Sequence, residues 1–144
     1  MVTESITGVP SSVEKKTQPP SPLVVLVDDD ASVRHALRRL ISAAGFAVEA
    51  FASGRELLAS NNVHHAGCAV LDVHLRDEGG FDVQQRLAAL GLTMPIVFIT
   101  GDTSDAIAER ALRAGAVACV QKPVSDTQLL RAIREALGRP QKHE

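Results

Sequence analysis

The sequence predicts an α/β fold in which helices cover both faces of a five-stranded parallel sheet. Short runs of β-branched and leucine residues alternate five times with stretches whose apolar residues recur at helical spacing. The first run, Leu23–Val27, is apolar throughout, as is typical of strands buried on both faces of a parallel sheet. Strict alternation of strand and helix favours a doubly wound sheet whose strands all run parallel.

Turn and capping residues indicate where the elements begin and end. Gly45 follows the first helical stripe, as glycine does at many helix ends. Ser53 and Glu56 form a capping box that should open a short helix, and Ser125 with Gln128 should cap the last helix. The predicted strands are Leu23–Val27, Phe46–Phe51, Cys68–Leu71, Pro95–Ile99 and Val117–Val120; the predicted helices begin near Val33, Ser53, Phe81, Ser104 and Ser125.

The chain of 144 residues has room for one domain. Residues 1–22 contain four of the seven prolines and no sustained periodicity, so we expect a disordered N-terminal tail. The domain should span residues 23–139. Residues 140–144 form a short charged end, after which we expect no helix-turn-helix output region.

Composition narrows the functional classes. The net charge is −2 and the basic residues are scattered, which argues against direct nucleic acid binding by this chain. No apolar run approaches the roughly 20 residues of a membrane span. Cys68 and Cys119 form no CxxC pair, and reduced thiols in a cytoplasmic protein are the expected reading.

Five strand–helix units favour the flavodoxin-like (βα)5 arrangement with strand order 2-1-3-4-5. Ligands of such sheets bind outside the carboxyl ends of the strands, at the switch point between strands 1 and 3. Asp28 and Asp29 end strand 1, Asp72 ends strand 3, Thr100 ends strand 4, and strand 5 runs into Lys122. We therefore expect three carboxylates, a hydroxyl and an ammonium in one crevice.

Three close carboxylates repel one another, so either a cation joins them or their pKa values rise. Carboxylate oxygens suit Mg²⁺, which also shares phosphate ligands. The alternative is that these acids are solvated helix caps, which is the expected role of Asp30. With a cation present, Asp72 could attack a phosphoryl group in line, while Lys122, the Thr100 hydroxyl and the Gly101 N–H contact phosphoryl oxygens.

These residues resemble the receiver domain of bacterial two-component response regulators, especially the FixJ type. The resemblance covers about Leu23 to Leu137. It is carried by VDDD at 27–30, LDV at 71–73, Gly80, FITG at 98–101 and KP at 122–123. It implies a signalling phosphoacceptor rather than a conventional enzyme, phosphorylated by a histidine kinase or phosphotransfer protein.

The resemblance also implies individual roles. Asp72 would be the phosphoacceptor, Asp29 a direct Mg²⁺ ligand and Asp28 a ligand through water. The backbone carbonyl of His74 would be a further ligand, with a metal-binding imidazole as the alternative. By the same resemblance, Thr100 would be the switch hydroxyl, Lys122 would bind phosphate, and the bond before Pro123 would be cis.

Two residues depart from the family pattern. Arg76 stands where a proline usually follows the acceptor strand, so the loop 75–80 should be more mobile. Cys119 stands where a Tyr or Phe usually moves inward on phosphorylation, and the chain contains no Tyr or Trp. Cys119 is expected at the edge of the core, with a redox-responsive thiol as the alternative.

The output surface implied by the resemblance is helix 4, strand 5 and helix 5, which would bind a target protein or a second copy of the chain. A stand-alone regulator and the receiver part of a DNA-binding transcriptional regulator both remain open. A flavodoxin-like electron carrier is disfavoured because no Tyr or Trp is available to stack on a flavin. A haloacid-dehalogenase-type phosphatase is disfavoured because His74 stands where its second Asp would be.

Overall fold

The computed structural model describes residues 22–138. The predicted tail and C-terminal end therefore lie outside the described residues, apart from Pro22. The elements in chain order are β2 (Leu23–Val27), α2 (Ala31–Ala43), β3 (Ala47–Phe51), α3 (Gly54–Ala59), the 3₁₀ helix η1 (Val63–His65), β4 (Ala66–Asp72), α4 (Gly80–Ala89), β5 (Ile96–Thr100), α5 (Asp105–Arg113), β6 (Ala118–Gln121) and α6 (Asp126–Leu137).

The five strands form one sheet in the order β3-β2-β4-β5-β6, and every adjacent pair is parallel. Counted along the chain, this is the predicted order 2-1-3-4-5. Val27 pairs with both Phe51 and Leu71, so the carboxyl ends of β2, β3 and β4 are level. This alignment places the loops after β2 and β4 beside each other.

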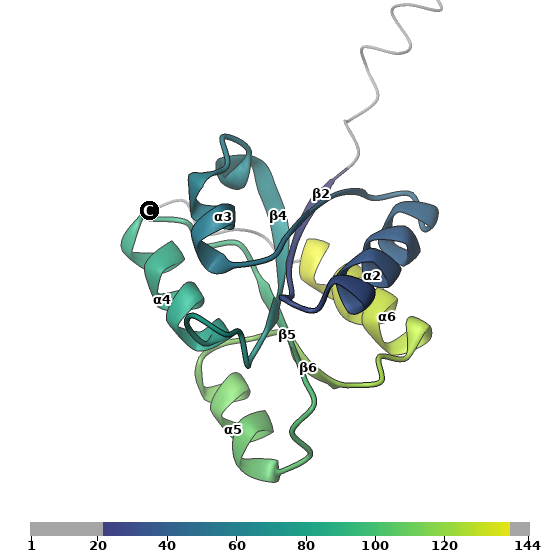
Figure 1. Cartoon of the computed structure of the whole chain (residues 1–144), viewed down its shortest axis with the longest axis vertical. Coiled ribbons are helices and arrows are strands. Elements are labelled where there is room, and N and C mark those ends of the chain that lie inside the picture. Colours follow the sequence, from purple (N-terminus) through teal and green to yellow (C-terminus); the bar gives the residue numbers. More distant parts are fainter. Residues whose placement is uncertain (1–21, 139–144) are drawn as a thin grey trace, which may run out of the picture.

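Helices cover both faces of the sheet, with α2 and α6 on one side and α3, α4 and α5 on the other (Figure 1). Each side has its own apolar core. Phe81 and Phe98 pack in one core with ring centroids 4.5 Å apart, and Ile41 and Ile133 are fully buried in the other. Within residues 22–138, no helix is both long and apolar enough to cross a membrane.

Local sequence signals located the predicted caps of several helices. Gly45 follows α2 with φ +100°, a conformation that glycine adopts without steric cost. The Ser53 hydroxyl accepts from Glu56 N, while the Glu56 carboxylate accepts from Ala52 N rather than from Ser53 N as in a regular capping box. Ser125 caps α6 through Gln128 N, as predicted.

Several boundaries differ from the prediction by one or two residues. Strand β4 begins at Ala66 instead of Cys68, and β5 and β6 each begin and end one residue later than predicted. The 3₁₀ helix η1 was not predicted. These differences arise because sheet pairing, rather than local sequence, decides how far a strand extends.

Candidate phosphoacceptor site

Three aspartates meet at the carboxyl edge of the sheet. Asp28 and Asp29 follow β2, and Asp72 is the last residue of β4, the strand next to β2. One carboxylate oxygen from each lies within 4.8 Å of the others. Asp28 is fully buried and Asp72 is 3% exposed. The predicted convergence of strand ends is therefore present.

Lys122 closes the cluster from the loop after β6. Its Nζ lies 2.9 Å from Asp72 Oδ2 and 3.0 Å from Asp28 Oδ2. The Lys122 backbone N–H donates to Thr100 O at 2.7 Å, which fixes this loop against β5. The peptide bond from Lys122 to Pro123 is cis, as predicted. One ammonium thus bridges two buried carboxylates.

The cluster has more negative than positive charge, and the pKa values reflect this. Burial raises the pKa of Asp28, the nearby Asp72 charge raises it further, and the Asp30 N–H and Lys122 offset these effects only in part. Burial opposes the Lys122 charge, but its hydrogen bond with Asp72 and its ion pairs with Asp72 and Asp28 outweigh burial and raise its pKa. The site therefore favours a bound cation.

A divalent cation fits the residues present. Asp28 Oδ2 is completely buried, and among the described residues its one ion-pair partner is Lys122 Nζ, which lies 3.0 Å away but forms no regular hydrogen bond with it. A buried carboxylate oxygen in this condition is costly unless another positive group contacts it. Asp29 and Asp72 supply further hard oxygens nearby. Such a donor set suits Mg²⁺ better than a softer metal ion.

The acceptor candidate Asp72 is held at both oxygens. Oδ1 accepts from His74 N at 2.9 Å, and Oδ2 accepts from Lys122 Nζ. The His74 side chain is exposed, and the acidic cluster does not include it. Gly80 packs against the end of β4: a Cβ at this position would lie 2.5 Å from Asp72 O. A glycine is required there for close backbone packing.

Thr100 is the last residue of β5 and is 1% exposed. Its Oγ1 accepts from Asp102 N at 2.9 Å, so its hydroxyl hydrogen stays available to another acceptor. The Asp102 carboxylate accepts from Ser104 N, which lowers the pKa of Asp102. Gly101 is exposed, and a Cβ there would meet no atom within 4 Å. Packing within residues 22–138 therefore does not require glycine at 101.

Cys119 lies on β6, half-buried, and lines a pocket of about 240 Å³ together with Thr100, Ala108 and Gln128. Thr100 and Cys119 therefore face the same pocket. Burial raises the pKa of the Cys119 thiol, which lowers the fraction of reactive thiolate and disfavours the redox-responsive alternative.

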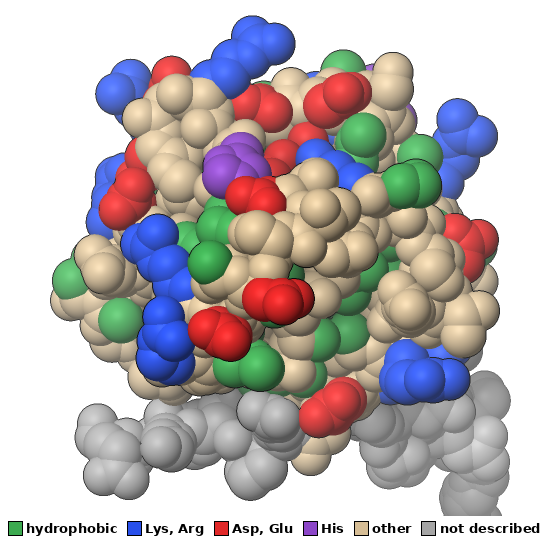
Figure 2. Space-filling view, turned by 90° about the horizontal axis from the view of Figure 1, so that it is seen from below, with side chains coloured by type: hydrophobic (Ala, Val, Ile, Leu, Met, Phe, Trp, Pro, Cys, Tyr) green, Lys and Arg blue, Asp and Glu red, His purple; other side chains and the backbone are tan. Residues whose placement is uncertain are grey.

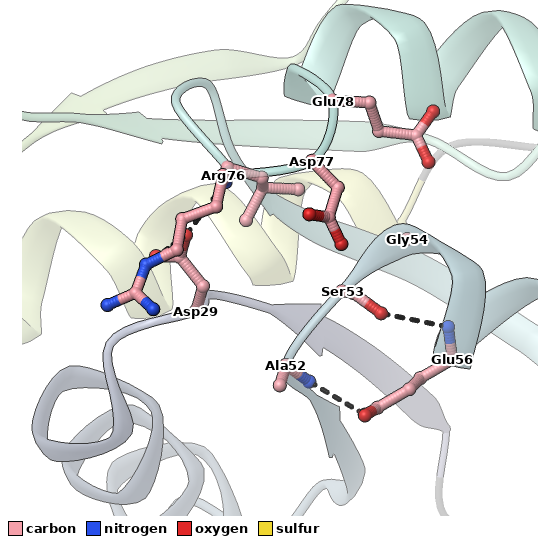
Figure 3. Close-up of a pocket in the computed structure, with 9 residues that line it drawn as sticks. Asp29, Ala52, Ser53, Gly54, Glu56, Arg76, Asp77 and Glu78 are labelled. Carbon is pink, nitrogen blue, oxygen red and sulfur yellow. Dashed lines mark hydrogen bonds and ion pairs between the residues drawn. The ribbon is translucent and has the colours of Figure 1, made fainter.

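A second hollow adjoins the acidic cluster, between the loop after β3 and the loop after β4 (Figure 3). It is about 330 Å³ and is lined by Asp29, Ser53, Arg76 and Asp77, among others. In Figure 3 the Arg76 side chain extends over Asp29, and the Asp77 side chain points toward Ser53.

Seen from below, acidic side chains lie close to basic side chains and a histidine on the surface of the molecule (Figure 2).

Sequence reasoning missed three supporting contacts. Arg34 Nη1, on α2, donates to Asp28 O at 2.8 Å and so holds the loop that carries the acidic pair. Arg76 N donates to Asp29 Oδ2 at 2.8 Å. The close packing of Gly80 on Asp72 is the third. Gly80 was recognised in the sequence only as a motif position. Nothing in the spacing of Arg34 or Arg76 along the chain predicts a contact with Asp28 or Asp29.

Comparison with known proteins agrees with this geometry. The family model described as the response regulator receiver domain matches residues 24–134. Response regulator protein TodT of Pseudomonas putida is 40% identical over 115 residues, which are 80% of this chain and 51% of that protein. Transcriptional regulatory protein TdiR of Thauera aromatica is 34% identical over 115 residues, which are again 80% of this chain and 51% of that protein.

The chain thus spans about half the length of these curated relatives. Among solved structures, a response regulator receiver protein from Burkholderia phymatum is 38% identical with a TM-score of 0.72, over 85% of this chain and 100% of that one. The matched residues include both edge strands of the sheet, β3 and β6, and all three aspartates of the acidic cluster. From its sequence, fold and relatives, this chain belongs to the receiver domain family of two-component response regulators.

Proposed function

We propose that Asp72 accepts a phosphoryl group from a histidine kinase or phosphotransfer protein, and that this modification switches a protein-interaction surface. The observation that carries the proposal is the pair of buried carboxylates, Asp72 and Asp28, bridged by the Lys122 ammonium at the edge of the sheet. A buried carboxylate with an ammonium at 2.9 Å is a suitable nucleophile for a group whose charge must be neutralised as it arrives.

The transfer uses few groups. An Asp72 oxygen forms the new P–O bond while the P–N bond to the donor imidazole breaks, and the electron pair returns to the ring nitrogen. The product is an acyl phosphate. Lys122 then pairs with a phosphoryl oxygen instead of the free carboxylate. The Thr100 hydroxyl and the Gly101 N–H are the proposed further donors.

We propose Mg²⁺ as the cofactor. Asp29 and Asp72 would bind it directly, Asp28 through water, and His74 through its backbone carbonyl. When bound, the cation neutralises the carboxylates and one phosphoryl oxygen. The buried Asp28 Oδ2, which has no regular hydrogen bond, and the proximity of the three carboxylates support this assignment.

The proposed output surface consists of α5, β6 and α6. Phosphorylation adds roughly 1.5 to 2 negative charges beside Thr100. Movement of Thr100 toward the phosphoryl group would pull on the loop before α5. Helix α5 buries a single residue, Ala111, so little packing opposes its movement. This surface would contact a target protein or a second copy of the chain in the cytoplasm.

The alternative output is transcriptional. TdiR is named a transcriptional regulatory protein, and this chain matches 51% of its length. The present chain would then be the receiver part of a longer DNA-binding regulator, with DNA bound by a region outside it. The catalytic proposal for Asp72 is the same in both cases.

Intact mass measurement tests the phosphoacceptor directly. The protein is incubated with a small phosphodonor and Mg²⁺, and the wild type should gain the mass of one phosphoryl group. Asp72→Asn should gain none, and EDTA should prevent the gain. Asp105→Asn, an exposed aspartate on α5, is the matched control and should behave as the wild type. An unmodified wild type, or a phosphorylated Asp72→Asn, would overturn the proposal.

A further inference from the structure

Arg76 contacts the same carboxylate that is the proposed direct metal ligand. Its backbone N–H donates to Asp29 Oδ2 at 2.8 Å, and its Nε lies 3.8 Å from the same oxygen. The two residues are 47 positions apart in the sequence, so this contact ties the loop after β4 to the loop after β2. Figure 3 shows the arginine side chain extending across Asp29.

The backbone part of this contact is particular to a chain with no proline at this position. A proline has no N–H and could not donate to Asp29. With arginine at 76, the chain gains both a backbone donor and a guanidinium beside one acid of the cluster. Asp29 is the most accessible of the three acids, at 22% side-chain exposure.

We propose that Arg76 is a positioning residue that competes with the divalent cation for Asp29 and thereby links metal binding to the loop 73–79. The inference rests on the metal site of the proposed function. An oxygen that accepts a hydrogen bond from Arg76 offers less electron density to a metal ion, and the guanidinium adds positive charge where the cation must enter.

The two parts of Arg76 should contribute differently. The guanidinium is 87% exposed and 3.8 Å away, so solvent screens most of its effect. The N–H donates to a charged acceptor at short range, and such hydrogen bonds are stronger than an exposed ion pair. Binding linkage is reciprocal, so a cation that takes Asp29 must also loosen the loop.

Isothermal titration of the unphosphorylated protein with Mg²⁺ measures the competition without any phosphoryl transfer. Arg76→Ala should bind Mg²⁺ roughly threefold more tightly than the wild type, as expected for loss of an exposed charge. Arg76→Pro, which also loses the N–H, should bind about tenfold more tightly. Arg39→Ala removes an exposed arginine from α2 and should leave the affinity unchanged.

Amide hydrogen exchange provides the second readout. In the wild type, saturating Mg²⁺ should increase exchange of the Arg76 amide, while amides in the centre of β4 stay protected. This measurement needs no variant, so it applies even if Arg76→Pro folds poorly.

The outcomes separate the two proposals. If both Arg76 variants bind Mg²⁺ as Arg39→Ala does, or if the Arg76 amide stays protected at saturation, the competition is overturned while phosphorylation of Asp72 is untouched. A wild type that binds no Mg²⁺ overturns both the competition and the metal part of the proposed function.

Discussion

Lys122 Nζ lies between two buried carboxylates, 2.9 Å from Asp72 Oδ2 and 3.0 Å from Asp28 Oδ2. The lysine side chain is 24% exposed, whereas Asp28 is fully buried. The ammonium therefore has two functions in the unphosphorylated protein. It holds the acceptor carboxylate in place, and it is the nearest compensation for a cluster that carries excess negative charge.

Replacing Lys122 should destabilise the protein. Lys122→Met leaves Asp28 and Asp72 facing each other without their shared cation, and uncompensated buried charge of this kind costs about 3–5 kcal/mol. Urea unfolding followed by circular dichroism at pH 7 measures the change in the free energy of unfolding. Arg131→Ala, an exposed cation on α6, is the control and should change it by less than about 0.5 kcal/mol. Equal stabilities of Lys122→Met and the wild type would show that the ion pairs contribute nothing.

Asp28 should make stability fall with rising pH in metal-free buffer. Its pKa in the folded protein is raised above the ordinary value of 3.8. Between 3.8 and the raised pKa the folded state holds more protons than the unfolded state, so the free energy of unfolding decreases as pH increases. Above the raised pKa the contribution is constant.

Asp28→Asn should remove this decrease. The difference in unfolding free energy between Asp28→Asn and the wild type should grow from pH 4 upward and then level off. Unfolding series in EDTA across this pH range measure it, with the exposed Glu109→Gln as the control. A difference that shrinks as pH rises would mean that the Lys122 ion pair, rather than burial, governs Asp28.

Magnesium should stabilise the folded state in proportion to its occupancy. A ligand that binds only the folded protein at 100 times its Kd adds about 2.7 kcal/mol. Thermal unfolding with increasing Mg²⁺ should therefore show a rising midpoint that EDTA reverses. Asp29→Asn should lose most of the rise, while Glu109→Gln should keep it. An identical rise in Asp29→Asn would exclude Asp29 as a ligand.

Replacement by alanine should destabilise the protein at Gly80 but not at Gly101. A Cβ at Gly80 would lie 2.5 Å from Asp72 O, so the start of α4 or the acceptor strand must shift. We expect Gly80→Ala to cost about 1–3 kcal/mol of stability and to slow phosphorylation of Asp72. Gly101→Ala meets no neighbour and should be nearly neutral in stability. Denaturant unfolding and the phosphoryl mass assay measure both effects.

The switch should act through the backbone around α5. Because Cys119 provides no aromatic ring, we expect a phosphoryl mimic to shift amide resonances in residues 101–120, with the resonances of α2 as the internal reference. Comparison of ¹H–¹⁵N spectra with and without the mimic measures this. Unchanged resonances in 101–120 would refute movement of this segment as the readout.

Much of the site could be predicted because parallel strands place their carboxyl ends at one edge. Once the alternating pattern indicated the order 2-1-3-4-5, Asp28 and Asp72 had to lie at the carboxyl ends of adjacent strands, and the structure confirms it. The same argument brought Lys122 to the crevice. Thr100 reaches the same edge. Its hydroxyl oxygen accepts a hydrogen bond from Asp102 N, and the residue also lines the pocket beside Cys119.

The sequence by itself determined the strands, their order and the acidic edge. Apolar runs locate the strands, and the strict alternation of strand and helix favours one strand order. Because parallel strands end at the same edge of the sheet, the acidic residues that follow them meet there. Only the tertiary structure decided that Arg76 binds Asp29, that Arg34 holds the Asp28 carbonyl, and that Gly80 packs on Asp72. These contacts depend on the paths that loops take across the sheet edge. No spacing in the sequence encodes those paths, because loop conformation is selected by the packed elements on either side.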